Sequence, residues 1–157
     1  MATEPIIAYL DDHLAGSATA TQILEVLHED TGLGAWSLAL LKEIEADGRV
    51  LTDVRLRIDR TPNPLKDAIG WFAGALGRVK LHQQVSGAVG KLEALEALAV
   101  GIQGKLALWK ALAVAADSRL SGIDFGPLRG RALAQYDEVE ERRLEVARAV
   151  LGTTSAI

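Results

Sequence analysis

The sequence predicts an all-α protein, a four-helix bundle with one long crossover between its second and third helices. Four stretches carry apolar residues at alternating steps of three and four, the period of an amphipathic helix. The first two and the last two of these stretches are joined by short connections, whereas residues 59–90 separate the second from the third. A connection of that length can return along the bundle, so we expect the second and third helices to run in the same direction.

The longest of these stretches, Lys91–Ala116, is the one on which the bundle is organised. It is rich in the strong helix formers Ala, Leu, Lys and Glu. One apolar stripe comprises Leu92, Leu95, Ala99, Ile102, Leu106, Trp109 and Ala113. A second apolar set lies off that stripe: Leu98, Leu108, Leu112 and Val114. We therefore expect neighbours to cover this helix on more than one side.

Two glycine pairs stand in or near this helix, in Gly87-Ala-Val-Gly-Lys91 and Gly101-Ile-Gln-Gly-Lys105. They do not match a phosphate-binding P-loop, which needs a longer glycine spacing, a Ser or Thr after the Lys, and a preceding strand. Their spacing of two heptads keeps them on one helix face. We expect them to let a neighbouring helix approach closely.

The other long helices are marked by their caps and stops, and we expect them at about Thr3–Glu29, Leu33–Ile58 and Asp124–Leu151. Prolines and an asparagine then end the second helix and begin the crossover. Within the crossover, Leu65–Arg78 predicts a short, unusually apolar helix that lies across the bundle and covers it.

Composition restricts the classes of protein that fit. The 157 residues form one domain by length, 1–157, which can bury its own core. The chain has no Cys, so disulfides, thiolate metal sites and cysteine nucleophiles are absent. With a net charge of −4 and no cluster of Lys and Arg, we do not expect nucleic acid as a partner. Glu93, Glu96, Lys105 and Lys110 interrupt the most apolar helix where a span needs roughly 20 apolar residues, and no signal peptide is evident, so we expect a cytoplasmic protein without a membrane partner.

The helix order with its long crossover resembles the ferritin-like superfamily over essentially the whole chain. Two segments are similar to a bacterial group of ferritin-like proteins: Tyr9-Leu-Asp-Asp-His-Leu-Ala-Gly-Ser17 in the first helix and Gly101–Trp109 in the third. This resemblance implies a ferritin-like four-helix bundle with a long crossover, between its second and third helices, that carries a short helix.

The resemblance also implies a position for a metal centre, but the usual ligands are missing. Di-metal carboxylate bundles use a Glu from each of two helices and Glu-x-x-His from the other two. Of the three histidines, His13, His28 and His82, only His28 has a Glu three residues before it, Glu25, whereas the usual site needs two such motifs, so we predict no metal site of the usual kind. The polar residues expected near the family's metal position are His13, Glu43, Asp47, Gln135, Glu138 and Arg142. When the helix midpoints are aligned, Glu43 falls level with Arg142 and Asp47 with Gln135, which predicts an inward Glu43–Arg142 ion pair.

Three functions remain open at this level. The first is a non-catalytic bundle that acts through self-association, as a homodimer, or through partner binding, because the apolar surface of Lys91–Ala116 and Leu65–Arg78 exceeds the needs of one core. The second is a metal-dependent oxidase or metal-storage bundle of the di-iron or di-manganese type with an altered site. The third is a binder of apolar small molecules. We assign no catalytic residue and predict no cofactor, and iron or manganese belongs only to the second alternative.

Overall fold

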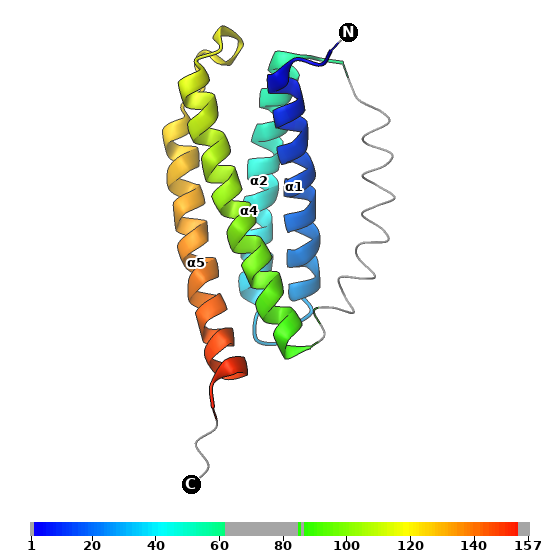
Figure 1. The fold of residues 1–157 in the computed structure, drawn as a ribbon, viewed down its shortest axis with the longest axis vertical. Helices are drawn as coiled ribbons and strands as arrows, with labels where there is room; N and C mark the ends of the chain where they lie inside the picture. The colour runs from blue at the N-terminus through cyan, green and yellow to red at the C-terminus, as the bar shows by residue number, and fades with distance from the viewer. Residues whose placement is uncertain (1, 62–84, 86, 154–157) are drawn as a thin grey trace.

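The computed structural model describes residues 2–61, 85 and 87–153, and within these residues the protein is all-α (Figure 1). Its four long helices are α1 (Pro5–Leu27), α2 (Gly34–Ile58), α4 (Ala88–Ala115) and α5 (Phe125–Leu151), and a short 3-10 helix, η1 (Ser118–Leu120), lies between the last two. The predicted all-α bundle is confirmed for this part of the chain. The short helix expected at Leu65–Arg78 lies outside the described residues.

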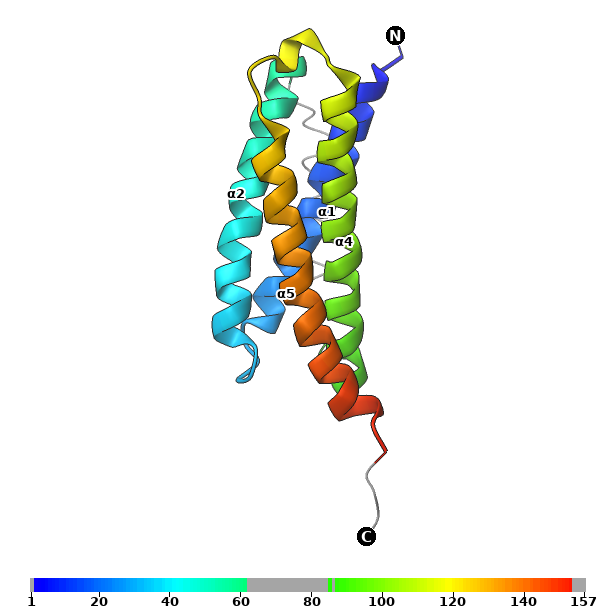
Figure 2. The same cartoon turned by 90° about the vertical axis from the view of Figure 1, so that its left-hand side faces the viewer.

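The helices are arranged as two antiparallel hairpins, α1 with α2 and α4 with α5 (Figures 1 and 2). The most extensive packing is between α4 and α5, followed by α1 against α2, and a smaller contact of α1 with α4 joins the two hairpins. The views show α2 and α4 running in the same direction, as expected for a crossover that returns along the bundle.

The helix ends differ from the predicted ones by a few residues. Thr3 does not cap α1; Glu4 takes the N-cap position because Pro5, which lacks an N–H, occupies the first helical position. Asp124 caps α5 as predicted, since its side chain accepts a hydrogen bond of 2.9 Å from the Gly126 N–H. At its C-terminus, α4 ends at the cap residue Ala116, which adopts a left-handed conformation with φ 49°.

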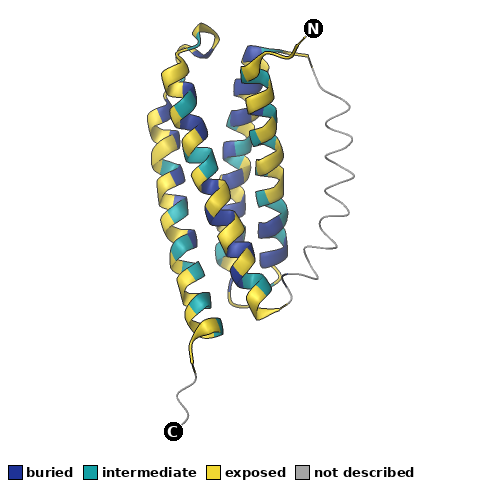
Figure 3. Cartoon of the chain, in the orientation of Figure 1, coloured by how far each residue is buried: buried dark blue, intermediate teal, exposed yellow. Residues whose placement is uncertain are grey.

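The core is a single cluster of aliphatic side chains from all four long helices (Figure 3). Both predicted stripes of α4 contribute to it: Leu92, Leu95, Ala99, Ile102, Leu98, Leu108, Trp109 and Leu112 are buried. We expected neighbouring helices to cover both stripes along their whole length. This is wrong at the C-terminal end of α4, where Ala113 is exposed and Val114 is 84% exposed.

Among the described residues, α4 is the one helix long and apolar enough to cross a membrane by length and composition. Its charged residues therefore do not exclude a span on these criteria, contrary to the sequence-based expectation. Core helices of bundles pass the same criteria, so the finding does not assign the helix to a membrane.

The turn between α1 and α2 is built around the Asp30 side chain. Its Oδ1 accepts hydrogen bonds from the N–H groups of Gly32, at 2.9 Å, and Leu33, at 3.1 Å. Its Oδ2 lies 2.5 Å from the Nζ of Lys91 in the first turn of α4. The hydrogen bond from Lys91, above all, lowers the pKa of Asp30 from its usual value of 3.8, and the backbone N–H groups add to this while partial burial opposes it. Asp30 thus shapes the first hairpin and ties it to the second.

The pKa of Asp30 predicts a pH dependence of stability. Because the folded-state pKa lies below 3.8, the stabilisation from Asp30 is complete above that value and is lost as the pH falls through the folded-state pKa. We expect Asp30→Asn to lower the free energy of unfolding by roughly 1 kcal/mol at neutral pH and by clearly less at about pH 3. Urea unfolding followed by circular dichroism at both pH values measures this difference. An equal loss at both would contradict it, and Asp53→Asn, at an exposed position of α2, is the matched control.

Candidate functional site

The centre of the bundle holds one buried carboxylate, that of Asp47 on α2, whose side chain is 3% exposed. The Nζ of Lys105 on α4 donates to its Oδ2 at 2.6 Å, and the Nε2 of Gln135 on α5 donates to the same oxygen at 3.2 Å. On the other side, Nη2 of Arg131 forms an ion pair with Oδ1. Three helices therefore meet at a single carboxylate.

Gln135, which is 1% exposed, connects this carboxylate to a second one. Its amide oxygen accepts a hydrogen bond from Lys105, and its Nε2 donates to Glu43 Oε2 at 3.0 Å as well as to Asp47. The amide thus uses its acceptor and both of its donors, which is what a buried polar side chain requires. Glu43 itself is exposed, at the edge of the network.

The charges of this network have partners of opposite sign within it. Burial lowers the pKa of Lys105 from its usual 10.5, and the nearby charge of Arg131 acts in the same direction, while the hydrogen bond and charge of Asp47 and the charge of Glu43 oppose them. Two cations and two carboxylates share the centre, and each carboxylate has a hydrogen-bond donor. Such a group of charges is tolerated in a core because each charge has a partner.

The predicted ion pair of Glu43 with Arg142 does not form. Arg142 Nη1 lies 3.2 Å from Glu145 Oε2 on its own helix, and its guanidinium carbon lies 6.0 Å from the centroid of a Trp36 ring. The contacts of Trp36 with Arg142, Glu43 with Gln135, and Asp47 with Arg131 share one antiparallel register. Aligning the helix midpoints misplaced α5 against α2 by about two turns.

The remaining predicted residues fall into three groups. Asp47 and Gln135 meet as expected. His13 lies outside the network; its ring packs edge-to-face against Tyr9 with centroids 4.7 Å apart, and burial lowers its pKa from 6.5 against the opposing charge of Asp12. Glu138 is exposed on α5, away from the centre.

Sequence reasoning missed the two cations of the network. Lys105 follows Ile102 by three residues and precedes Trp109 by four, so it shares their buried face, and this spacing was the available signal. Arg131 precedes Gln135 by four residues on α5 and offers the same signal. Charged side chains on a buried stripe indicate partners on facing helices.

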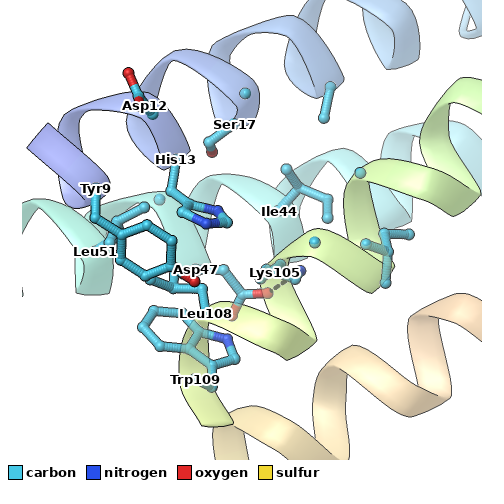
Figure 4. A pocket seen from close by; sticks show the side chains of 16 residues that line it. Tyr9, Asp12, His13, Ser17, Ile44, Asp47, Leu51, Lys105, Leu108 and Trp109 are labelled. Atoms are coloured by element: carbon cyan, nitrogen blue, oxygen red, sulfur yellow. Dashed lines mark hydrogen bonds and ion pairs between the residues drawn. The ribbon is translucent and has the colours of Figure 1, made fainter. Parts of the chain in front are cut away.

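A cavity of about 350 Å³ adjoins the network between α1, α2 and α4 (Figure 4). Asp47, Lys105 and Trp109 form one part of its wall, and Tyr9 and His13 of α1 form another. Most of the remaining lining is aliphatic or glycine. The cavity therefore combines an apolar wall with a few polar groups, the usual composition of a small-molecule site.

Four glycines from three helices line this cavity: Gly16, Gly48, Gly101 and Gly104. A Cβ built on Gly16, Gly101 or Gly104 would have no atom within 4 Å, and one on Gly48 would meet only Ser17 Oγ, at 3.2 Å. The expectation that glycines admit a closely packed helix is therefore wrong for Gly101 and Gly104. Their neighbours stand too far away, and the missing side chains leave open space.

The cavity and the network share atoms that lack hydrogen-bond partners. Trp109 is fully buried, and its indole N–H has no acceptor among the described residues. Asp47 Oδ1 is in ion-pair contact with Arg131 but receives no hydrogen bond there either. One end of the cavity thus has a buried N–H donor without a partner, next to a carboxylate oxygen whose one partner among the described residues is Arg131.

The donor set at the centre does not fit a metal ion. Within residues 2–61, 85 and 87–153, no three His, Cys, Asp or Glu side chains lie close enough together to hold one. The Asp47 carboxylate is instead contacted by an ammonium and a guanidinium, which carry donors only and repel a cation.

Fold and centre together define an all-α four-helix bundle with a closed ion network beside a cavity. Comparison of the chain with protein-family models, with curated proteins and with solved structures gives no match. The resemblance to the ferritin-like superfamily therefore stays a prediction.

The ion network predicts that replacing Asp by Asn at two positions of α2 changes the free energy of unfolding by very different amounts. Asp47→Asn leaves Lys105 and Arg131 without their shared carboxylate and should lower the free energy of unfolding by on the order of 3 kcal/mol. Asp53→Asn, at an exposed position, should change it by less than about 0.5 kcal/mol. Urea unfolding measures both, and similar losses would show that Asp47 is not an essential partner of these cations.

Proposed function

We propose that the protein is a non-catalytic, ferritin-like helical bundle that binds a small, mostly apolar molecule in the cavity between α1, α2 and α4. The observation that carries this proposal is the convergence of four helix-interior glycines on one cavity. Catalysis is not part of the proposal, because the central carboxylate, that of Asp47, is already neutralised by Lys105 and Arg131.

The glycines that line the cavity lower the stability of their own helices. A glycine inside a helix is less stable than alanine by about 1 kcal/mol. At Gly16, Gly101 and Gly104 a methyl group would meet no neighbour, so packing gives no reason for its absence. A bound molecule that occupies this space would explain why alanine is absent. The free energy of binding that molecule would offset the stability lost through the glycines.

The ferritin-like arrangement is supported by helix direction and by the polar centre. α2 and α4 run in the same direction and each has an antiparallel neighbour (Figure 1), an arrangement that is compatible with a bundle of that kind. In this proposal, Lys105 and Arg131 take the place that metal ions hold in such bundles. The metal-dependent alternative has little support from a centre that contains two cationic side chains. A cytoplasmic location belongs to the proposal as well, on the basis of composition.

Substitutions of Gly104 test the cavity directly. Gly104→Leu should fill it and reduce binding of butylbenzene, measured by calorimetric titration, at least tenfold, whereas Gly104→Ala should bind it and gain up to about 1 kcal/mol of stability. Native mass spectrometry should detect a ligand that co-purifies with the wild type and is lost with Gly104→Leu.

The matched control is Gly130→Leu, since Gly130 is an exposed helix-interior glycine of α5 that does not line the cavity. It should leave binding unchanged. Failure of the wild type to bind butylbenzene or to carry any ligand would overturn the proposed function.

Self-association is a second candidate, favoured by exposed aliphatic side chains on the outer helices. On α4, Val89, Val100 and Val114 are 53%, 71% and 84% exposed, and their spacings keep them on one helix face. On α5, the exposed Leu133, Leu144 and Leu151 likewise share one face. Aligned apolar residues on a surface are typical of contacts between subunits. The other surface predicted for a dimer, Leu65–Arg78, lies outside the described residues.

The surface of α4 can be tested without disturbing the core. Val100→Glu should convert a dimer at micromolar concentration into a monomer, as measured by light scattering, because the interface would have to bury a charge. Leu56→Glu introduces the same charge at an exposed position of α2 and should leave the dimer intact. A wild-type protein that is monomeric throughout would remove this second candidate.

A further inference from the structure

We propose that the molecule bound in the cavity carries an uncharged hydroxyl group, which docks between Trp109 and Asp47. This inference rests on the proposed function, because it names the chemical class of ligand for the same cavity. It goes further by assigning a polar specificity to a site that is otherwise apolar.

The first observation concerns the donor. Trp109 is 0% exposed, lines the cavity, and its indole N–H has no partner among the described residues. In the view of Figure 4, the indole nitrogen is on the edge of the ring that faces the Asp47 carboxylate. Buried N–H groups of tryptophan normally have an acceptor, so a group that accepts a hydrogen bond is missing here.

The second observation concerns the acceptor. Oδ2 of Asp47 is contacted by two donors, Lys105 and Gln135, whereas Oδ1 has only the Arg131 guanidinium as its partner among the described residues. Arg131, the ion-pair partner of Oδ1, belongs to α5, and α5 does not line the cavity. A carboxylate oxygen can accept more than one hydrogen bond, so Oδ1 retains capacity toward a donor in the cavity.

A hydroxyl group is the smallest ligand group that satisfies both atoms. It can donate to Asp47 Oδ1 and accept from the Trp109 N–H at the same time. A carbonyl would only accept, and would leave Oδ1 unsatisfied. A carboxylate would be repelled by Asp47, and an ammonium group would have no acceptor role toward Trp109 and would lie beside Lys105.

The size of the cavity limits the apolar part of this ligand. An apolar cavity of about 150 Å³ accommodates benzene. The present cavity, about 350 Å³, has room for a molecule with roughly twice as many non-hydrogen atoms. An aryl or alkyl alcohol of that size fits both the volume and the mostly apolar wall.

Calorimetric titration of the full chain with four matched probes tests the assignment: phenylbutanol, butylbenzene, phenylbutyrate and phenylbutylamine. We expect phenylbutanol to bind roughly tenfold more tightly than butylbenzene, and the two charged probes to bind more weakly than either. Trp109→Phe keeps an aromatic ring but removes the N–H, and should abolish the difference in affinity between phenylbutanol and butylbenzene. Trp36→Phe is the control, because Trp36 also has an unpaired N–H but does not line the cavity.

Each outcome distinguishes the two proposals. Equal affinities of the wild type for phenylbutanol and butylbenzene would overturn the hydroxyl assignment and leave the binding function in place. A preference that survives in Trp109→Phe would also overturn it, as would a crystal structure in which an ordered water stays between Trp109 and Asp47 beside the bound alcohol. If no probe binds, both proposals are wrong.

Discussion

The arrangement of the bundle depends on the neutralisation of one buried carboxylate. A charge at the position of Asp47 is tolerated only where partners from other helices reach it, and here they come from α4 and α5. The backbones of α2 and α5 do not pack closely, so long side chains span the distance between them. The separation of α2 and α5 is therefore bridged by the long side chains of Arg131 and Gln135.

The helices themselves could be predicted because their causes are local. Apolar spacing, Pro5 at the start of α1 and the cap at Asp124 all act within a few residues of the boundaries that they determine. The register between α2 and α5 has no local cause. It depends on where the connection through η1 places the start of α5, and matching helix midpoints does not account for this. The predicted partner of Glu43 was consequently wrong by two turns, although Asp47 and Gln135 were correctly paired.

The cavity shows a second limit of sequence reasoning. A glycine within a helix is compatible with a close neighbour or with open space beside it, because the residue is the same in both cases. Which one occurs depends on the distance to the facing helix, and Gly101 and Gly104 have no neighbour within reach of a Cβ. The roles of Lys105 and Trp109 likewise became evident only when the facing side chains were placed. Their buried spacing was visible in the sequence, but their partners were not.

The two-hairpin arrangement also has a consequence for folding and for binding. The most extensive packing, α4 with α5 and α1 with α2, joins helices that follow one another in the sequence. Such contacts close small loops, so the hairpins can form early, and their association is the step that brings distant parts of the chain together. The cavity lies at the seam between them, lined by α1 and α2 from one hairpin and α4 from the other. A molecule bound there would contact both hairpins and would shift the equilibrium toward their associated state, so occupancy of the cavity and assembly of the fold are thermodynamically coupled.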